Sequence, residues 1–272
     1  MALTQGERRS VRIVLLGLGA INRRVADLLR SRQSAAAIVG VIVKRPKSLI
    51  PNVSGGTAVI ASPSDLIAVA PDVILEAASR EAVLEWGDSA LRTAQRFVVS
   101  SASAFADDGL LRALRETAKQ FGSQLVLSPG AVAGMDALSA AARLGMWEVR
   151  HRIVKSPRSW GAAAGQNVSR DVREPSVFFR GSAREAARRY PLNTNVTVVS
   201  ALSGVGLDKT VVELIADASA VTNRHEIHAV GDFGSLSIML ENRPLQSNPK
   251  SSELAALALV RLAENEVLEF VL

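Results

Sequence analysis

A short apolar run that ends in a glycine-rich turn constrains this chain more than any other feature. Residues Val11–Leu16 are mostly valine, isoleucine and leucine, which is typical of a strand buried on both faces of a parallel sheet. Gly17 and Gly19 follow at once, and the apolar residues after them recur at helical spacing. A strand, a glycine turn and a helix in direct succession predict the first crossover of an α/β fold.

The same alternation continues as far as residue 130. Further strands are expected at 38–43, 57–61, 73–76, 97–100 and 125–127, with helices between the later ones at 63–70, 80–95 and 106–121. Strands that alternate with helices at this spacing form a parallel sheet covered on both faces. We therefore predict an N-terminal, Rossmann-type, doubly wound parallel sheet over residues 1–130.

The pattern changes in the second half of the chain. Residues 148–155 alternate between apolar and charged side chains, which predicts a half-exposed antiparallel strand. Further strands are expected at 211–216, 226–230 and 235–241, helices at 135–145, 182–189 and 195–204, and a mobile loop at 161–174. These elements predict a second, α+β domain on a mixed or antiparallel sheet over residues 131–244. The helix expected at 251–263 is apolar almost all round, so we expect residues 245–272 to pack back on the first domain.

Composition excludes several classes of protein. The 272 residues include no cysteine, which excludes disulfides, thiolate metal sites and cysteine nucleophiles. The net charge of +6 would suit a nucleic-acid partner, but acids separate the basic pairs and there is a single tyrosine for base stacking. Attraction of small anions fits the charge better, and we expect no nucleic-acid partner. No apolar stretch approaches the ~20 residues of a membrane span, so we expect no membrane partner and a cytoplasmic protein.

The glycine turn itself predicts the binding of a dinucleotide. Gly17 permits a tight turn, and Gly19 lets the backbone approach a pyrophosphate at the positive end of the helix. Asn22 occupies the position at which the dinucleotide fingerprint has a third glycine, so we expect the helix to pack less closely or to shift. NAD and NADP are the expected cofactors.

The residues that would meet the adenosine ribose leave the choice of cofactor open. The second strand runs into Lys44 and Arg45, and no acid stands there to bind the ribose hydroxyls. The two cations suit the 2′-phosphate of NADP, although a solvated basic turn explains them nearly as well. NAD binding without the acid is the third interpretation.

Candidate acid–base residues are few, because the chain has only three histidines. His151 lies between two arginines on the alternating strand and is interpreted as a surface residue. His225 and His228 point to opposite faces if their segment is extended, so only one of them faces a given cleft. Motifs typical of hydrolases, kinases and zinc enzymes are absent, and no metal is expected.

Several segments, in order and across nearly the whole chain, resemble the L-aspartate dehydrogenase family. They are residues 17–21, 101–107, 130–138, 179–187, 190–196, 206–210, 223–227 and 242–254. The resemblance implies an oxidoreductase with an N-terminal Rossmann domain and a C-terminal α/β domain whose sheet contributes to a homodimer. It also implies oxidation of L-aspartate by NAD or NADP to iminosuccinate, which hydrolyses to oxaloacetate and ammonia and feeds pyridine nucleotide biosynthesis.

The resemblance also suggests site residues. It places the active-site histidine at His225, the glycine-turn contacts with the cofactor at Gly17, Gly19, Ala20 and Ile21, and further cofactor contacts at Ala131 and Asn195. The sequence departs from the family at Asn22 and at Pro129, both on the cofactor side.

The two carboxylates of an aspartate substrate need cationic or amide partners. Asn193, Asn248 and Lys250 are our candidates, from their polarity and their position in loops, although a solvated Lys250 is equally compatible with the sequence. Two other functions fit the same pattern. One is an NAD(P)-dependent dehydrogenase of another amino or hydroxy acid, and the other is a non-catalytic dinucleotide-binding sensor.

Overall fold

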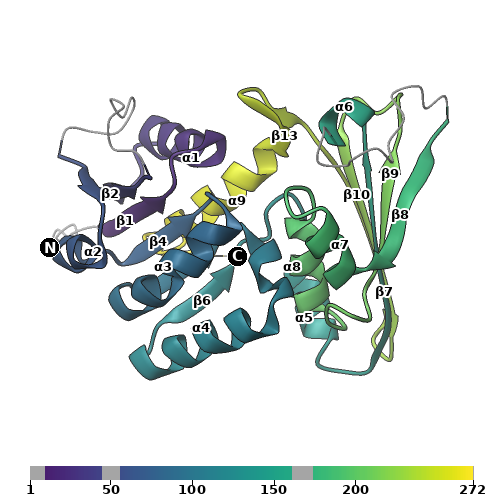
Figure 1. The fold of residues 1–272 in the computed structure, drawn as a ribbon, viewed down its shortest axis with the longest axis horizontal. Helices are drawn as coiled ribbons and strands as arrows, with labels where there is room; N and C mark the ends of the chain where they lie inside the picture. Colours follow the sequence, from purple (N-terminus) through teal and green to yellow (C-terminus); the bar gives the residue numbers. More distant parts are fainter. Residues whose placement is uncertain (1–9, 45–55, 161–173, 272) are drawn as a thin grey trace, which may run out of the picture. The chain divides into compact units, whose positions relative to one another are not determined.

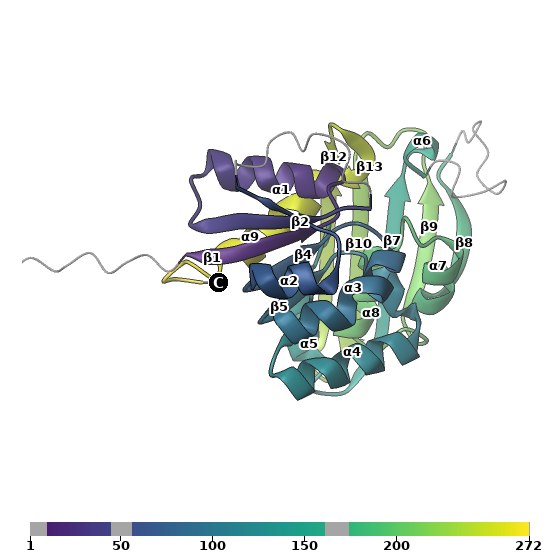
Figure 2. The same ribbon diagram turned by 60° about the vertical axis from the view of Figure 1, so that its left-hand side comes forward.

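The computed structural model describes residues 10–44, 56–160 and 174–271, so Arg45 and nearly all of the loop expected at 161–174 lie outside the described residues. The chain divides into two compact units (Figures 1 and 2). The first comprises Met1–Ser101, Asp108–Ser128 and Ala256–Leu272, and the second comprises Ala102–Asp107 and Pro129–Ala255. The domain limits expected from the sequence stay a prediction. Among the described residues, no helix has the length and apolar character to cross a membrane.

The first unit contains a six-stranded sheet in the order β3-β2-β1-β4-β5-β6, in which every pair is parallel. This confirms the doubly wound sheet predicted from the sequence. The strands are β1 (Val11–Leu16), β2 (Ala36–Ile42), β3 (Ala58–Ile60), β4 (Val73–Glu76), β5 (Arg96–Val99) and β6 (Gln124–Leu127). The helices are α1 (Ala20–Ser31), α2 (Pro63–Val69), α3 (Arg80–Thr93), α4 (Asp108–Phe121) and most of α9 (Glu253–Glu264).

The core of the first unit lies between β1 and helices α1 and α9. Val25 and Leu29 of α1 pack with Leu259 and Ala263 of α9 against the central strands. The helix α9 is therefore part of the core of the N-terminal unit, although Leu257 on the same helix is 42% exposed. The helix is therefore not buried on all sides, although its sequence is apolar almost all round.

Local sequence signals set the start of two helices. Ser62 accepts a hydrogen bond from the backbone of Asp65, the Asp65 carboxylate accepts one from the backbone of Ser62, and Pro63 takes the first helical position of α2. Ser182 and Glu185 form the same reciprocal pair at the start of α7 (Ala183–Arg189). These caps satisfy N–H groups that have no partner within their helices.

The second unit is built on a five-stranded sheet in the order β11-β10-β7-β9-β8. Only β7 and β9 run parallel, so the sheet is mixed, as predicted. Its strands are β7 (Met146–Lys155), β8 (Ser176–Ser182), β9 (Val211–Ala216), β10 (Asn223–Gly231) and β11 (Gly234–Asn242). Helices α5 (Met135–Ala141), α7 and α8 (Asn195–Ser203) lie against one face of this sheet (Figure 1).

Three short elements and one strand of this unit were not anticipated. They are the 3₁₀ turn η1 (Ala102–Ala106), helix α6 (Pro157–Trp160), the hairpin of β12 (Pro244–Leu245) with β13 (Asn248–Ser252), and β8. Strand β8 is largely exposed and has no regular apolar alternation, and β13 contains a proline. Neither segment therefore carries the periodic signal from which strands are predicted.

Candidate active site and cofactor pocket

The turn between β1 and α1 needs glycine at its first position. Gly17 has a φ of +82°, and a Cβ placed there would lie 2.5 Å from the Cβ of Ala78. Asn22 is fully buried, and its amide donates to the carbonyls of Leu16 at 3.0 Å and of Gly17 at 2.8 Å. The asparagine that we expected to loosen the packing of the helix or to shift it thus ties the helix to the turn by hydrogen bonds.

The start of helix α1 is open to a ligand. Gly19 is the N-cap residue, no side chain caps this end, and the first turn carries no acid. The nearest atom to a Cβ at Gly19 would be the carbonyl oxygen of Ala77, 3.8 Å away, so packing within the chain does not require glycine there. Uncapped N–H groups at Ala20 and Ile21 and room for close approach suit a pyrophosphate group.

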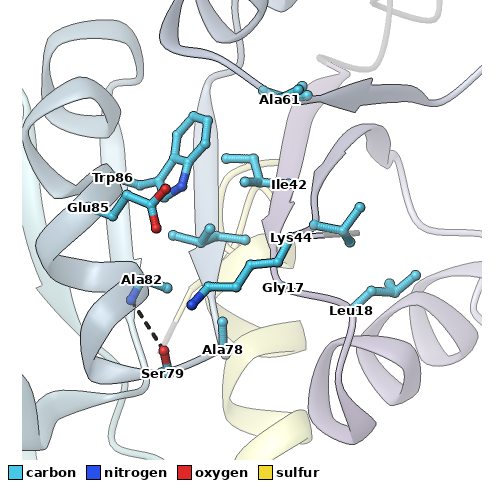
Figure 3. Close-up of a pocket in the computed structure, with 13 residues that line it drawn as sticks. Gly17, Leu18, Ile42, Lys44, Ala61, Ala78, Ser79, Ala82, Glu85 and Trp86 are labelled. Carbon is cyan, nitrogen blue, oxygen red and sulfur yellow. Dashed lines mark hydrogen bonds between the residues drawn. The ribbon is translucent and has the colours of Figure 1, made fainter. Parts of the chain in front are cut away.

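A cavity of about 600 Å³ adjoins this turn in the first unit (Figure 3). It lies at the carboxyl ends of the strands, where the strand order reverses between β1 and β4, which is where open parallel sheets bind dinucleotides. Lys44 reaches across the cavity toward Ser79, as Figure 3 shows. The lining consists of Leu16, Gly17, Leu18, Ile42, Val43, Lys44, Ile60, Ala61, Ala78, Ser79, Ala82, Glu85 and Trp86. These residues fit the adenosine end of NAD or NADP.

Glu76 at the end of β4 organises the loops beside this cavity, and sequence reasoning missed it. Its buried carboxylate accepts hydrogen bonds from the backbone N–H groups of Ala78, Ser79, Ser100 and Ser101 and from the Ser101 hydroxyl, at 2.7–3.1 Å. Burial raises the pKa of Glu76, and the hydrogen bonds oppose that shift. The carboxylate thus fixes the backbone that follows two neighbouring strands.

In the second unit, strand β10 separates the two neighbouring histidines. His225 is 2% exposed on the helix-covered face, whereas His228 is exposed and its Nδ1 lies 2.9 Å from the Ser237 hydroxyl. The prediction that the two histidines point to opposite faces is confirmed.

His151 is fully buried, so its interpretation as a surface residue was wrong. It stands two residues from Val149 and two from Ile153, and both of those are buried as well. Because side chains alternate along a strand, this spacing places His151 on the apolar face together with them. The flanking arginines lie on the other face.

Hydrogen bonds join His151 to His225 and fix their tautomers. Ser200 Oγ donates to the carbonyl of Thr197 at 3.1 Å, so it accepts from His151 Nδ1 at 2.8 Å. His151 Nε2 then accepts from His225 Nδ1 at 3.3 Å. This assignment leaves Nε2 of His225 as an unprotonated lone pair, which is the form that a general base requires.

Both histidines are held neutral at physiological pH. Burial, with a smaller contribution from the Lys155 charge, lowers the pKa of His151 to about 3. Burial, followed by the effects of His151 and Lys155, holds the pKa of His225 well below its ordinary value. Among the described residues, no cluster of three or more His, Asp or Glu side chains forms a metal site.

Lys155, the last residue of β7, is a further buried charge that sequence reasoning missed. It is 5% exposed, and burial lowers its pKa to about 8. Its ammonium lies over the ring of Trp160, 5.1 Å from the ring centre. Lys155 shares its strand face with His151, four residues earlier, so the alternation that identifies one also identifies the other.

The other predicted site residues of this unit lie in three places. The Asn195 amide oxygen accepts from the backbone N–H of Ser103 at 2.9 Å, at the start of α8. The Ala131 carbonyl accepts from Asn242 at 2.8 Å, in a turn where Pro129 accepts from the Val132 N–H. Asn193 is buried just before α8, whereas Asn248 bonds to Ser251 within β13 and Lys250 is exposed. Gly17, Gly19, Ala20 and Ile21 belong to the first unit.

Family models of dehydrogenase domains match both parts of the chain, and relatives that span nearly the whole chain belong to one family. Residues 136–266 match the model of the aspartate dehydrogenase C-terminal domain, and residues 17–128 match that of the homoserine dehydrogenase NAD-binding domain. The L-aspartate dehydrogenase of Brucella anthropi is 48% identical over 94% of this chain and 96% of its own length. That of Serratia proteamaculans is 40% identical over 92% and 95%.

Solved structures show the same fold. The crystal structure of aspartate dehydrogenase from Thermotoga maritima superposes with a TM-score of 0.78 at 24% identity, covering 97% of this chain and all of that one. A homoserine dehydrogenase from Thiobacillus denitrificans gives a TM-score of 0.60 at 14% identity, covering 95% and 74%.

Proposed function

Because the chain belongs to the L-aspartate dehydrogenase family, we propose that it is an NAD(P)-dependent oxidoreductase that converts L-aspartate to iminosuccinate. Iminosuccinate then hydrolyses to oxaloacetate and ammonia. The observation that carries the proposal is the buried His225, whose Nδ1 is committed to His151 and whose Nε2 is left as a lone pair. The glycine turn and its cavity supply the complementary cofactor site.

The chemistry requires the α-amine of aspartate to be neutral before hydride leaves Cα. When bound, NAD or NADP accepts that hydride. We assign the removal of the ammonium proton to Nε2 of His225. The resulting imidazolium keeps its Nδ1–H on His151, and the two substrate carboxylates favour the charged ring, which offsets the effect of burial. Once that proton has passed to solvent, the same nitrogen takes a proton from the water that attacks the iminium carbon.

On the cofactor side, the proposal relies chiefly on backbone groups of the glycine turn. We propose that Gly17, Gly19, Ala20 and Ile21 bind the pyrophosphate, and that Ala131 and Asn195 meet the rest of the cofactor. Lys44 lies in the cavity that fits the adenosine, which supports a role beside a 2′-phosphate. Asn193, Asn248 and Lys250 remain our candidates for substrate contacts.

We further propose that the protein is a cytoplasmic homodimer and that its product feeds pyridine nucleotide biosynthesis. The face of the second sheet opposite its helices supports the dimer, since it carries the pairs of Arg152 with Glu213 and Glu226 and leaves Met239 69% exposed. No described helix covers Met239. Sedimentation at micromolar concentration should give a dimer, and a monomer would contradict this assignment.

The direct test follows absorbance of the reduced nicotinamide with L-aspartate and each cofactor, beside a panel of other amino and hydroxy acids. We expect reduction with L-aspartate and none with D-aspartate. Reduction with another substrate alone would retain the enzyme class and change its specificity. If the protein binds the dinucleotide but none of the substrates tested leads to its reduction, the protein would instead be a sensor.

A further inference from the structure

Lys155 is a buried cation with no ion pair in the part of the chain that the structure describes. Among residues 10–44, 56–160 and 174–271, no carboxylate forms an ion pair with its ammonium and no group accepts a hydrogen bond from it. The contact that the structure gives it is the ring of Trp160. Burying a charge without a counter-ion costs free energy, and an anionic ligand that binds to the ammonium would compensate this cost.

The nearby acids are occupied elsewhere. Glu213 and Glu226 pair with Arg152 on the opposite face of the sheet. Asp217 follows the strand residue that lies in register with Lys155, but its carboxylate accepts from the backbone and hydroxyl of Ser219 at 2.8 and 2.6 Å. The missing counter-ion is therefore not supplied by these side chains.

Trp160 holds the lysine without consuming its donors. The indole N–H donates to the carbonyl of Ile215 at 2.9 Å, and the ring meets Phe178 edge-on with the centroids 5.0 Å apart. The fixed ring attracts the ammonium through its π face, and this interaction uses no acceptor oxygen. All three N–H donors of Lys155 thus remain for an anion.

The position of Lys155 relates it to the proposed base. Lys155, Ile153 and His151 share one face of β7, and Ile153 stands in register with His225 on β10, so His225 shares that face. Lys155 and His151 are four residues apart on that face, and the charge of Lys155 contributes to the lowered pKa of both histidines. A cation and a neutral base therefore lie in one buried cluster.

We propose that Lys155 binds a carboxylate of the substrate and thereby selects a dicarboxylic amino acid. The inference rests on the proposed function, and it adds a binding residue that sequence reasoning did not include. The ammonium gains its counter-ion only when the substrate is present. An amino acid with a single carboxylate can occupy only one of two carboxylate-binding positions. It either leaves Lys155 without a counter-ion, or pairs with Lys155 and leaves the second position empty.

The test uses succinate, a dicarboxylate that has no amine and does not react, with the full-length protein at saturating NADH. We expect wild type to bind succinate in a calorimetric titration. Lys155→Met, which keeps the length of the side chain without its charge, should weaken that binding about 10- to 100-fold. The KM for L-aspartate should rise by a similar factor with a smaller change in kcat and an unchanged Kd for NADH. Lys209→Met, at an exposed lysine of the same unit, is the matched control.

A second measurement does not depend on how the variant folds. With [ε-¹⁵N]lysine in the wild-type protein, saturating succinate should move the Nζ resonance of Lys155 and leave that of Lys209 in place. An unmoved Lys155 resonance, or a folded Lys155→Met variant with unchanged succinate affinity and KM, would overturn the inference while aspartate oxidation stood. Lys155-dependent succinate binding without turnover of aspartate would instead retain the site and overturn the proposed function.

Discussion

The glycine turn of the first unit and the histidine–lysine cluster of the second are built in opposite ways. The turn presents backbone N–H groups. Its first glycine matters because it has no side chain, since a Cβ at Gly17 would collide with Ala78. The cluster presents buried side chains, and its members His151, Lys155 and His225 come from two strands about 70 residues apart. A side chain added to the first site should harm it, whereas a side chain removed from the second should harm that one.

The largest effect is expected from His225→Ala. Removing the proposed base should lower kcat by about 10²- to 10⁴-fold, and the Kd of the cofactor should stay unchanged because the glycine turn lies in the other unit. His228→Ala, on the exposed face of the same strand, is the control and should keep wild-type turnover. Wild-type kcat in His225→Ala would remove the base from the mechanism.

Two glycine substitutions separate folding from binding in the first site. Gly17→Ala forces a Cβ onto Ala78 at a positive φ, so we expect a loss of about 1–3 kcal/mol in the free energy of unfolding and weaker cofactor binding. Gly19→Ala meets no close atom and should retain stability while losing cofactor affinity. Equal stability losses at the two positions in urea unfolding would show that both glycines are structural.

His151→Phe tests whether the buried histidine positions its neighbour. The phenyl ring keeps the volume but leaves Nδ1–H of His225 without an acceptor, so kcat should fall about tenfold. The acid limb of the pH–rate profile should also move, because His151 contributes to the low pKa of His225. Ser200→Ala, one step further along the chain of hydrogen bonds, should have a smaller effect in the same direction. An unmoved pH profile would reduce His151 to a packing role.

Stability should fall in mild acid because of the second site. His151 titrates near 6.5 when unfolded and at about 3 when folded, so below pH 6.5 the unfolded state binds the additional proton. The contribution of the neutral, buried His151 to the free energy of unfolding is present in full above pH 6.5 and is lost progressively as the pH falls toward 3. Urea midpoints between pH 8 and 4 should therefore decline more steeply in wild type than in His151→Phe. Parallel curves would indicate that His151 is solvated when folded.

The smallest effect is expected from the two basic residues that follow the second strand of the sequence. Replacing Lys44 and Arg45 together by alanine should raise the KM for NADP severalfold more than that for NAD, because only NADP carries the 2′-phosphate. An unchanged ratio would assign both residues to a solvated turn.

The two regions also differ in how far the sequence predicted them. The strand, the glycine turn and the first helix are contiguous, so hydrophobic periodicity and two glycines sufficed to predict the fold of this region and to propose where the cofactor binds. Asn22 was identified as a departure, but its hydrogen bonds to the carbonyls of Leu16 and Gly17 depend on the path of the folded backbone. Glu76 gave no local signal, because its five donors come from two separate loops.

The second site shows where sequence interpretation needs more care. The strand period already placed His151 with Val149 and Ile153, yet the flanking arginines led to its interpretation as a surface residue. Lys155 follows the same period and was overlooked, because an isolated lysine is usually solvated. The partners of both residues come from β10, α6 and α8, and no pattern along β7 predicts them.

By itself the sequence determined most of the strands and helices, the parallel sheet, the glycine turn and the family, since each depends on residues close together in the chain or on an ordered set of motifs. The tertiary structure decided which histidine tautomer is available, which buried lysine of the described residues has no ion pair and which carboxylate organises the loops beside the cavity. Protonation state, tautomer and charge compensation depend on burial and on partners distant in sequence. These properties therefore exist only once the chain is folded.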